Sequence, residues 1–516
     1  MKNVLKALLA GVLFTTTLAG CGDDGNPAIT GQPDGGSADA GATTNKLPDF
    51  EGGVEAFKTT HALTQAYWYS RYNLGALVMK AGLGETFMPG EGMPEAMAKM
   101  VSDDKSQVML PSNPALLKRV FNRGNPSFTA AHDDKPMDFA DERWVGGQSV
   151  PTTGAAFGWT MVKELEWAKQ FHVDAHFGIP GKNDIPGANE RFAGLVLYAE
   201  AVMQAMELMQ APEKFNLGSS EDAHVALMAI ADLAQVTGAE TMPHSASNRY
   251  KQIAMGMAPD KDLAKAFLDQ ADMLYGSLPS PKNTRERATA IQALAFYGAA
   301  SATNRAAVKA KISDYAEALT TTSAIGTLDR AAIILGLTSA IRAVGAKDSW
   351  TASVKSTFNA FIADYDGKAG LFKDLDEYTP DTVAAVLRAL NGATLWAKVD
   401  NETAFHVLTD LFESVMDVGG LQISAPPLDE IPEYERLPSA SNADALFIRY
   451  PTLPTPPKAG GAYGIAPVSA AKATYSRATK KWTTEKTNYD TAGAMRLANE
   501  CIWLHSDEVD GFPQVP

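Results

Sequence analysis

The chain has 516 residues, with 45 Lys or Arg against 60 Asp or Glu, and a formal net charge of −15. Such an acidic balance argues against nucleic-acid binding, which needs a basic patch or stripe, so no nucleic acid is predicted as a partner. The two cysteines, Cys21 and Cys501, are too few for a disulfide framework.

The N-terminus has the pattern of an export signal. Two lysines precede a short uncharged apolar run that ends in the tetrapeptide LAGC, whose cysteine is Cys21. A cationic start, a short apolar core and small residues at its end are the features of a signal peptide. The tetrapeptide resembles the lipobox of bacterial lipoproteins. That resemblance implies that residues 1–20 are removed and that Cys21 becomes the lipidated first residue of the mature chain.

Lipidation predicts where the protein resides. Acyl chains contribute about 0.8 kcal/mol per buried methylene group, so several chains hold a folded domain on a membrane. Gly22 follows the cysteine, and in enteric bacteria the absence of Asp at this position favours the outer membrane. We therefore expect a lipid-anchored protein of the cell envelope, at the outer membrane. The alternative is an ordinary signal peptide with an unrelated cysteine at its cleavage site.

Composition divides the rest of the chain in two. Residues 21–47 are dominated by Gly, Asp, Ala and Thr and lack aromatic residues, so they are predicted to be a flexible tether. Residues 48–516 are long enough for one large domain. Within it, 48–153 combine an N-terminal helical pattern with proline-rich segments that are expected to wrap over the body.

From residue 154 to residue 418 the chain shows the apolar spacing of helices, at i, i+3 and i+4. The expected helices are 154–177, 188–210, 222–236, 261–278, 284–300, 304–320, 328–344, 349–365, 380–398 and 402–416. Thr379 precedes a proline at the first helical position and is expected to cap its helix. Gly326, Gly345 and Gly392 are expected to mark helix ends or bends.

The helices alternate between two types. Amphipathic helices with a charged face alternate with helices that are more apolar and richer in Ala and Gly; 305–320 and 328–344 are one such pair. The pattern resembles the (α/α) toroid, in which helical hairpins close into a barrel and the inner helices line a funnel. The predicted fold is therefore all-α, an (α/α) toroid with long wrapping loops and one small β-hairpin. An open helical-repeat solenoid is the alternative.

Residues 419–486 break the helical pattern with many prolines. A loop of this length inside a compact domain is uncommon and is usually functional. Its polar and aromatic group, Asp444, Arg449 and Tyr450, is the candidate binding site, because loops carry binding residues more often than helix surfaces do. The alternative is that the loop only braces one end of the barrel.

Two further elements are expected near the C-terminus. The segment AKATYSRATKKWTTEKT alternates around a turn and predicts an exposed β-hairpin. Residues 487–516 are expected to form a closing helix near 491–505 and a tail, with Asp490 as the helix cap. Cys501 falls in an apolar stretch of that helix and is predicted to be a buried small hydrophobe.

His172 and His176 are the candidate metal ligands. Four residues separate them, so on a helix they share a face and are spaced to bind one metal ion. No His-Glu-x-x-His motif is present, and no third ligand can be named from the sequence. The alternative is a pair of histidines packed and hydrogen-bonded between helices. Motifs for nucleotides and c-type haem are absent as well, so no cofactor is predicted.

An enzyme built on a toroid would need two carboxylates in the funnel, one as acid and one as base or nucleophile. Asp329, Asp381 and Glu190 are the candidates, with Trp159, Trp396 and Tyr297 as aromatic platforms for a sugar. Carboxylates in the first turn of a helix also stabilise the helix dipole, which is the alternative for Asp329 and Asp381. Tryptophans at helical spacing are more often part of a core.

Two functions are therefore carried forward. The leading prediction is a non-enzymatic envelope lipoprotein that binds an unknown ligand or envelope protein through the funnel mouth and the loop at 419–470. The alternative is a toroid enzyme that acts on a carbohydrate or another polymer. The enzyme requires two acidic side chains that point into the funnel within about 10 Å of each other.

Overall fold

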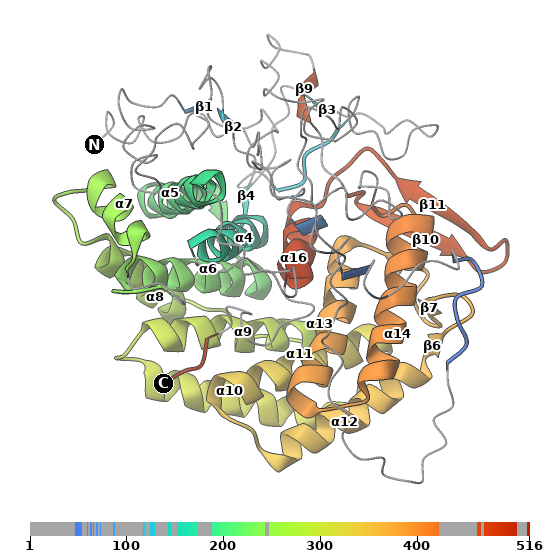
Figure 1. The fold of residues 1–516 in the computed structure, drawn as a ribbon. Coiled ribbons are helices and arrows are strands. Elements are labelled where there is room, and N and C mark those ends of the chain that lie inside the picture. The colour runs from blue at the N-terminus through green and yellow to red at the C-terminus, as the bar shows by residue number, and fades with distance from the viewer. Residues whose placement is uncertain are drawn as a thin grey trace, which may run out of the picture.

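A computed structural model describes most of the helical body of the chain. The described parts are 47–53, 124–128, 143–145, 152–172, 188–242, 247–422, 462–465, 469–502 and 513–516, with single positions between 59 and 73 and short strands at 86–87 and 117–118. Helices dominate these parts (Figure 1), and the prediction of an all-α fold is confirmed. Within the described residues, no helix is long and apolar enough to cross a membrane.

One set of helices packs in a closed order around the centre of the molecule (Figure 1). The inner helices are α4 (Gly154–His172), α6 (Ser220–Gly238), α9 (Thr284–Ala300), α11 (Thr327–Val344), α13 (Pro380–Ala397) and α16 (Thr491–Ile502). Each packs against the next, and α16 packs back against α4. This return contact favours the toroid over the open solenoid.

A second set of helices lies outside the first. The outer helices are α5 (Ala188–Gln210), α8 (Leu263–Gly276), α10 (Arg305–Thr320), α12 (Asp348–Ala363) and α14 (Asn401–Leu411), which continues as a π-helical segment (Phe412–Val418). Burial separates the two sets as the sequence predicted. Helix α9 is buried continuously over residues 288–298, whereas α10 buries only the stripe Val308, Ile312, Ala316 and Leu319.

The inner helices run parallel. Gly158 of α4 lies against Val225 of α6, about one turn from the start of each helix, and Arg388 of α13 pairs with Glu500 of α16 at matching depths. The N-termini of the inner helices therefore meet at one end of the ring. Side-chain caps fix where three of them begin, because Ser219, Asn283 and Thr379 each accept a hydrogen bond from a first-turn N–H group. The predicted cap at Thr379 is confirmed.

Two sequence interpretations of helices were wrong. Helix α7 (Arg249–Met257) was not predicted, because it is short and Gly256 weakens its pattern. Gly392 does not end or bend a helix but lies inside α13, where an added Cβ would come within 2.7 Å of the Thr338 hydroxyl of α11. Gly326 and Gly345, at φ +85° and +100°, do flank α11 as expected.

Short strands lie in the connections between the helices. The predicted hairpin is confirmed as β10 (Lys472–Ser476) and β11 (Lys481–Glu485), and β8 (Glu377–Tyr378) adds a third antiparallel strand just before α13. The remaining strands pair two by two: β1 (Thr86–Phe87) with β2 (Leu117–Lys118), β3 (Arg143–Val145) with β9 (Ala462–Ile465), β4 (Thr152–Thr153) with β5 (Phe215–Asn216), and β6 (Tyr365–Asp366) with β7 (Leu371–Phe372). A 3₁₀ turn (Pro212–Lys214) precedes β5.

The close approach of α4 and α6 at Gly158 can be tested by substitution. An added Cβ at Gly158 would lie 2.6 Å from the carbonyl oxygen of Val225, so Gly158→Ala must push the two helices apart. We expect it to lower the free energy of unfolding by about 1–3 kcal/mol. Gly256→Ala is the matched control, since nothing lies within 4 Å of that position in α7, and it should raise the value by about 0.5–1 kcal/mol. Urea unfolding of both variants measures the difference; equal effects would contradict the close packing.

Candidate functional site

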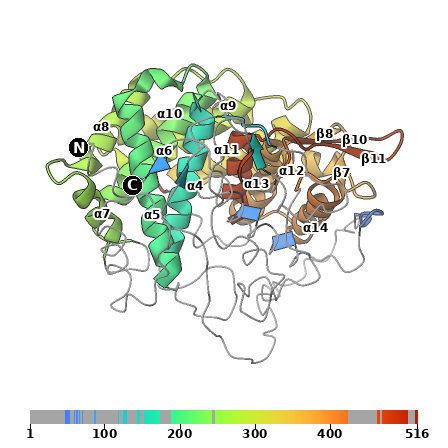
Figure 2. The same cartoon turned by 90° about the horizontal axis from the view of Figure 1, so that it is seen from above.

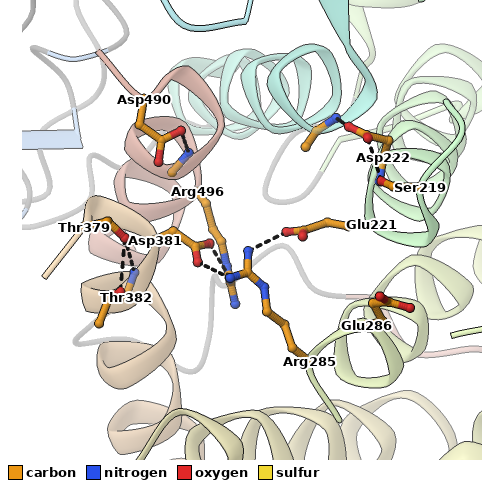
Figure 3. Close-up of polar contacts among 12 residues, drawn as sticks. Ser219, Glu221, Asp222, Arg285, Glu286, Thr379, Asp381, Thr382, Asp490 and Arg496 are labelled. Atoms are coloured by element: carbon orange, nitrogen blue, oxygen red, sulfur yellow. Dashed lines mark hydrogen bonds and ion pairs between the residues drawn. The ribbon is translucent and has the colours of Figure 1, made fainter. Parts of the chain in front are cut away.

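Three charged residues occupy the same register position in three inner helices. Glu221, Arg285 and Asp381 are each the second residue of their helix, α6, α9 and α13. Because these helices are parallel and begin at one end of the ring, their side chains point toward one another there (Figure 3). We call this region the N-terminal mouth, and it comprises Glu221, Arg285, Asp381, Asp490 and Arg496.

Arg285 spans the mouth. Its Nη2 donates to Glu221 Oε1 at 2.7 Å, and its Nη1 lies 2.6 Å from Asp381 Oδ2. The side chain of Arg285 is 47% exposed, that of Glu221 28% and that of Asp381 16%. The guanidinium group therefore links two helices that are not neighbours in the ring while it stays open to solvent.

Asp381 is the centre of the network. Its second oxygen, Oδ1, accepts a hydrogen bond from Nη1 of Arg496 at 2.6 Å, and the Arg496 side chain is buried. Burial favours the neutral form of Asp381, but the charges of Arg496 and Arg285 more than offset it, so the pKa of Asp381 is lowered. The guanidinium of Arg496 also lies 5.8 Å from the ring centre of Trp159, which makes this buried tryptophan a wall behind the network.

A second carboxylate, Asp490, lies near Asp381 at the start of α13. Its Oδ1 accepts a hydrogen bond from the N–H group of Gly493 at 3.0 Å, so the predicted cap of α16 is confirmed. An added Cβ at Gly493 would lie 2.2 Å from Asp490 Oδ2 and 3.0 Å from the backbone nitrogen of Asp381, which shows how tightly the two helix starts pack. Burial raises the pKa of Asp490 to about 6, and the nearby charge of Asp381 also raises it.

The rim of the mouth is held by further carboxylates with structural roles. Asp222 accepts from the Ala155 N–H group at 2.7 Å and from the Ser219 hydroxyl at 2.6 Å, so it ties the start of α4 to the start of α6. Glu286 accepts from the N–H group of Lys282, the residue before the cap Asn283, at 2.7 Å, and the Asn283 side chain accepts from the Glu286 N–H group at 2.9 Å. Both side chains are fixed by backbone donors.

A buried ion pair lies deeper along the same helices. Arg388 Nη1 and Glu500 Oε2 are 3.4 Å apart, with side chains 8% and 7% exposed. Arg388 is two turns beyond Asp381 on α13, and Glu500 is one turn beyond Arg496 on α16. The seam between α13 and α16 therefore carries alternating charges from the mouth toward the interior.

The separation of Glu221 and Asp381 is within the range required of paired carboxylates. Glu221 and Asp381 bond to the two terminal nitrogens of one guanidinium group, so their bonded oxygens are less than about 10 Å apart. Asp490 adjoins Asp381 and has a pKa shifted in the opposite direction. The mouth thus combines the ionised carboxylate of Asp381, the Asp490 carboxyl group, whose pKa is about 6, and one exposed guanidinium group, that of Arg285.

Several residues predicted from the sequence lie outside the part of the chain that the structure describes. These are the lipidation site Cys21, the loop group Asp444, Arg449 and Tyr450, and His176. His172 is the last residue of α4. Among the described residues, no group of three His, Cys, Asp or Glu side chains is placed to hold a metal ion. The loop site and the histidine pair remain predictions.

The predicted carboxylates and aromatics have separate positions. Asp381 lies in the mouth, whereas Asp329 accepts from the Ile325 N–H group at 3.0 Å and stabilises the start of α11. Glu190 falls on the outer helix α5. Trp396 packs under Arg342, whose guanidinium lies 4.4 Å from the ring centre, near the opposite end of α13.

Sequence reasoning missed Glu221, Arg285 and Arg496. Their partners are distant in sequence, and each residue taken alone has the ordinary character of a helix-surface charge. One signal was available: a charged residue stands at the second position of three of the more apolar helices. Parallel inner helices bring equal positions together, so this register is the pattern that would have identified the mouth.

The raised pKa of Asp490 predicts a specific dependence of stability on pH. The folded-state value of about 6 exceeds the ordinary 3.8, so this group's stabilising contribution is complete below pH 4 and is lost as pH rises through 6. Asp490→Asn keeps an acceptor for Gly493 without titrating. We expect it to match the parent near pH 4 and to be more stable by about 1–3 kcal/mol near pH 7.

Urea unfolding across this pH range measures the effect. Asp490→Ala serves as the control for the cap, because it removes both the titration and the acceptor, and it should be less stable than the Asn variant at every pH. Parallel pH profiles for the parent and Asp490→Asn would contradict a raised pKa.

Comparison with known proteins gives no relative on which to base a function. No family model, no curated protein and no solved structure matches the chain. The chemistry of the N-terminal mouth and the N-terminal sequence are therefore the grounds for a functional assignment.

Proposed function

We propose that the protein is a lipid-anchored lipoprotein of the cell envelope whose N-terminal mouth binds a polyhydroxylated ligand of the oligosaccharide class. The tetrapeptide ending at Cys21 and the Gly-rich and Asp-rich segment that follows it support the anchor and the tether. Gly22 supports the outer membrane as the location. The acidic chain supports a partner other than nucleic acid.

The observation that carries the ligand proposal is the bridge of Arg285 between Glu221 and Asp381 across the mouth. Carboxylates present two acceptors and guanidinium groups present parallel donors, and both match pairs of adjacent hydroxyl groups. Ion pairs as exposed as that of Arg285 contribute only about 0–1 kcal/mol. The hydroxyl groups of a ligand can therefore replace the ion-pair contacts of Arg285 with little loss of protein stability.

The ligand site extends, in this proposal, from the mouth to the proline-rich loop. Asp444, Arg449 and Tyr450 would supply a polar and aromatic cover for a ligand held by the mouth residues. Ligand sites in proteins combine such a few placed polar groups with apolar surface. An envelope protein that presents a polar loop is the alternative occupant of the same mouth.

A hydrolase is the second candidate function, favoured by the opposed pKa shifts of Asp490 and Asp381. Neighbouring carboxyl groups whose environments separate their pKa values are the usual arrangement of an acid and a base. Asp490 would protonate the leaving-group oxygen. Asp381, which Arg496 and Arg285 keep ionised, would activate the attacking water.

The anchor has a direct test. Cys21→Ser removes the thiol that would carry the lipid, so we expect the variant to leave the membrane fraction and the N-terminal peptide to lose the mass of its acyl chains. Fractionation followed by mass spectrometry of that peptide measures both. Cys501→Ser is the matched control and should remain with the membrane. A parent protein without acyl mass on Cys21 would contradict the proposal.

The ligand site is tested by calorimetric titration with three defined probes: maltohexaose, chitohexaose and a galacturonic acid oligosaccharide. We expect at least one to bind, and Arg285→Gln to weaken that binding by tenfold or more, because one lost charged hydrogen bond is worth about 1.5–3 kcal/mol. Arg287→Gln, on the same helix but outside the mouth, should bind like the parent. Equal affinities for both variants would contradict a site at the mouth.

The same samples separate binding from hydrolysis. New reducing ends that appear with the parent and not with Asp490→Asn would establish the hydrolase. Binding without new reducing ends in the parent would establish the binding protein.

A further inference from the structure

Residues 47–53, the first segment that the structure describes, are attached to one place on the surface of the helical body. The backbone N–H group of Glu51 donates to the carbonyl of Lys368 at 3.0 Å, and the two side chains form an ion pair at 3.0 Å. Gly53 packs against Glu413, and the carbonyl of Pro48 lies 3.4 Å from Nε2 of His406. Residues 47–53 are thus attached to the α12–α13 connection and to α14.

This attachment sets the point on the body from which the chain leads back to a lipidated Cys21. Residues 21–46 join the two points, and their Gly-rich composition is that of a flexible coil. A coil of that length spans roughly 25–30 Å on average. The surface around residues 47–53 is therefore the part of the described body that is nearest to Cys21 along the chain.

The β10–β11 hairpin lies beside this attachment and projects beyond the helices (Figure 2). The pKa of Glu51 is lowered by its hydrogen bond and ion pair with Lys368 and, in addition, by the charge of Lys480 at the hairpin turn. Lys480 at the tip therefore lies within electrostatic range of Glu51. Both lie on the side of the ring that carries α12, α13 and α14 (Figure 1).

The hairpin is strongly basic in an otherwise acidic chain. Five cations stand between residues 471 and 486, namely Lys472, Arg477, Lys480, Lys481 and Lys486, against the single carboxylate Glu485. Neighbouring acids pair with two of these cations: Lys472, at the open end of the hairpin, pairs with Glu377 at 3.0 Å, and Arg477, in the turn, pairs with Asp376 at 2.7 Å. In the described part of the chain, Lys480 and Lys481 form no ion pair, and both are exposed.

The turn that carries these two lysines is closed by a backbone hydrogen bond. Lys480 adopts a left-handed conformation, φ 55°, and its N–H group donates to the carbonyl of Ser476 at 2.7 Å. Below it, Trp482 packs between Tyr475 and Tyr378, with ring centres 5.1 and 6.0 Å away. A braced strand pair thus holds two unpaired ammonium groups outward.

We propose that the tip of the β10–β11 hairpin contacts the phosphate-bearing headgroups of the bilayer that holds the lipid anchor. The inference rests on the proposed anchoring at Cys21 and adds an orientation to it. Charge complementarity selects an anionic surface, and the attachment at residues 47–53 selects the bilayer as the one within reach. Each lysine near an anionic bilayer contributes roughly a fivefold gain in occupancy, which salt screens.

The test uses the full lipidated chain in two kinds of vesicle, phosphatidylcholine alone and phosphatidylcholine mixed with phosphatidylglycerol. An amine-reactive reagent labels the lysines, and mass spectrometry gives the rate at each one. We expect Lys480 and Lys481 to react several-fold more slowly in mixed vesicles, and high salt to abolish the difference. Lys261, between α7 and α8 on the other side of the ring, should react equally in both.

Substitutions make the result specific. Lys480→Glu should restore the reactivity of Lys481 in mixed vesicles, while Lys261→Glu should leave its protection intact. Chains that float with both kinds of vesicle but show equal rates at Lys480 and Lys481 would overturn the hairpin contact alone. Chains that fail to float with phosphatidylcholine vesicles would overturn the anchoring proposal and, with it, this inference.

Discussion

The contact between α16 and α4 determines the whole arrangement, because it closes the ring. It joins residues 335 to 340 positions apart: the buried Nζ of Lys163 donates to the Ala498 carbonyl at 2.7 Å, and the Asn499 amide donates to the Trp159 carbonyl at 3.2 Å. Burial holds the pKa of Lys163 well below its ordinary value. Helix α16 also packs against α13, and it brings Asp490 and Arg496, two of the five mouth residues, to the start of α13.

The two arginines of the mouth differ in burial. This difference explains how one network can both hold the helices together and remain accessible to a ligand. Arg496 is buried and holds Asp381 from behind, so its ion pair cannot be exchanged without leaving a charge unpaired. Arg285 approaches the same carboxylate from the solvent side and is nearly half exposed. Water screens the outer pair and not the inner one. The inner arginine positions the carboxylate, and the outer arginine is the group free to change partners.

Local sequence patterns were enough to predict the helices. The site could not be predicted in this way, because it forms only when the ring of helices closes. Helices such as α9 and α10 were predictable because apolar periodicity and caps act over a few residues; Thr379 and Asp490 were recognised for the same reason. Arg285 was not, since its partners lie 64 and 96 positions away and meet only when the parallel helices assemble. Gly392 was misread because a glycine that admits a neighbouring helix looks the same in sequence as one that breaks its own.

Cys501 can report on how often α16 separates from its neighbouring helices. It is 1% exposed on α16, and burial raises the pKa of its thiol, which makes the thiolate scarce as well as inaccessible. A thiol reagent can reach it only when α16 separates from its neighbours. The rate of that reaction therefore measures the free energy of local opening in the intact protein, in the way that hydrogen exchange does for a buried amide. With Cys21 acylated, the chain would hold no second thiol to obscure the signal.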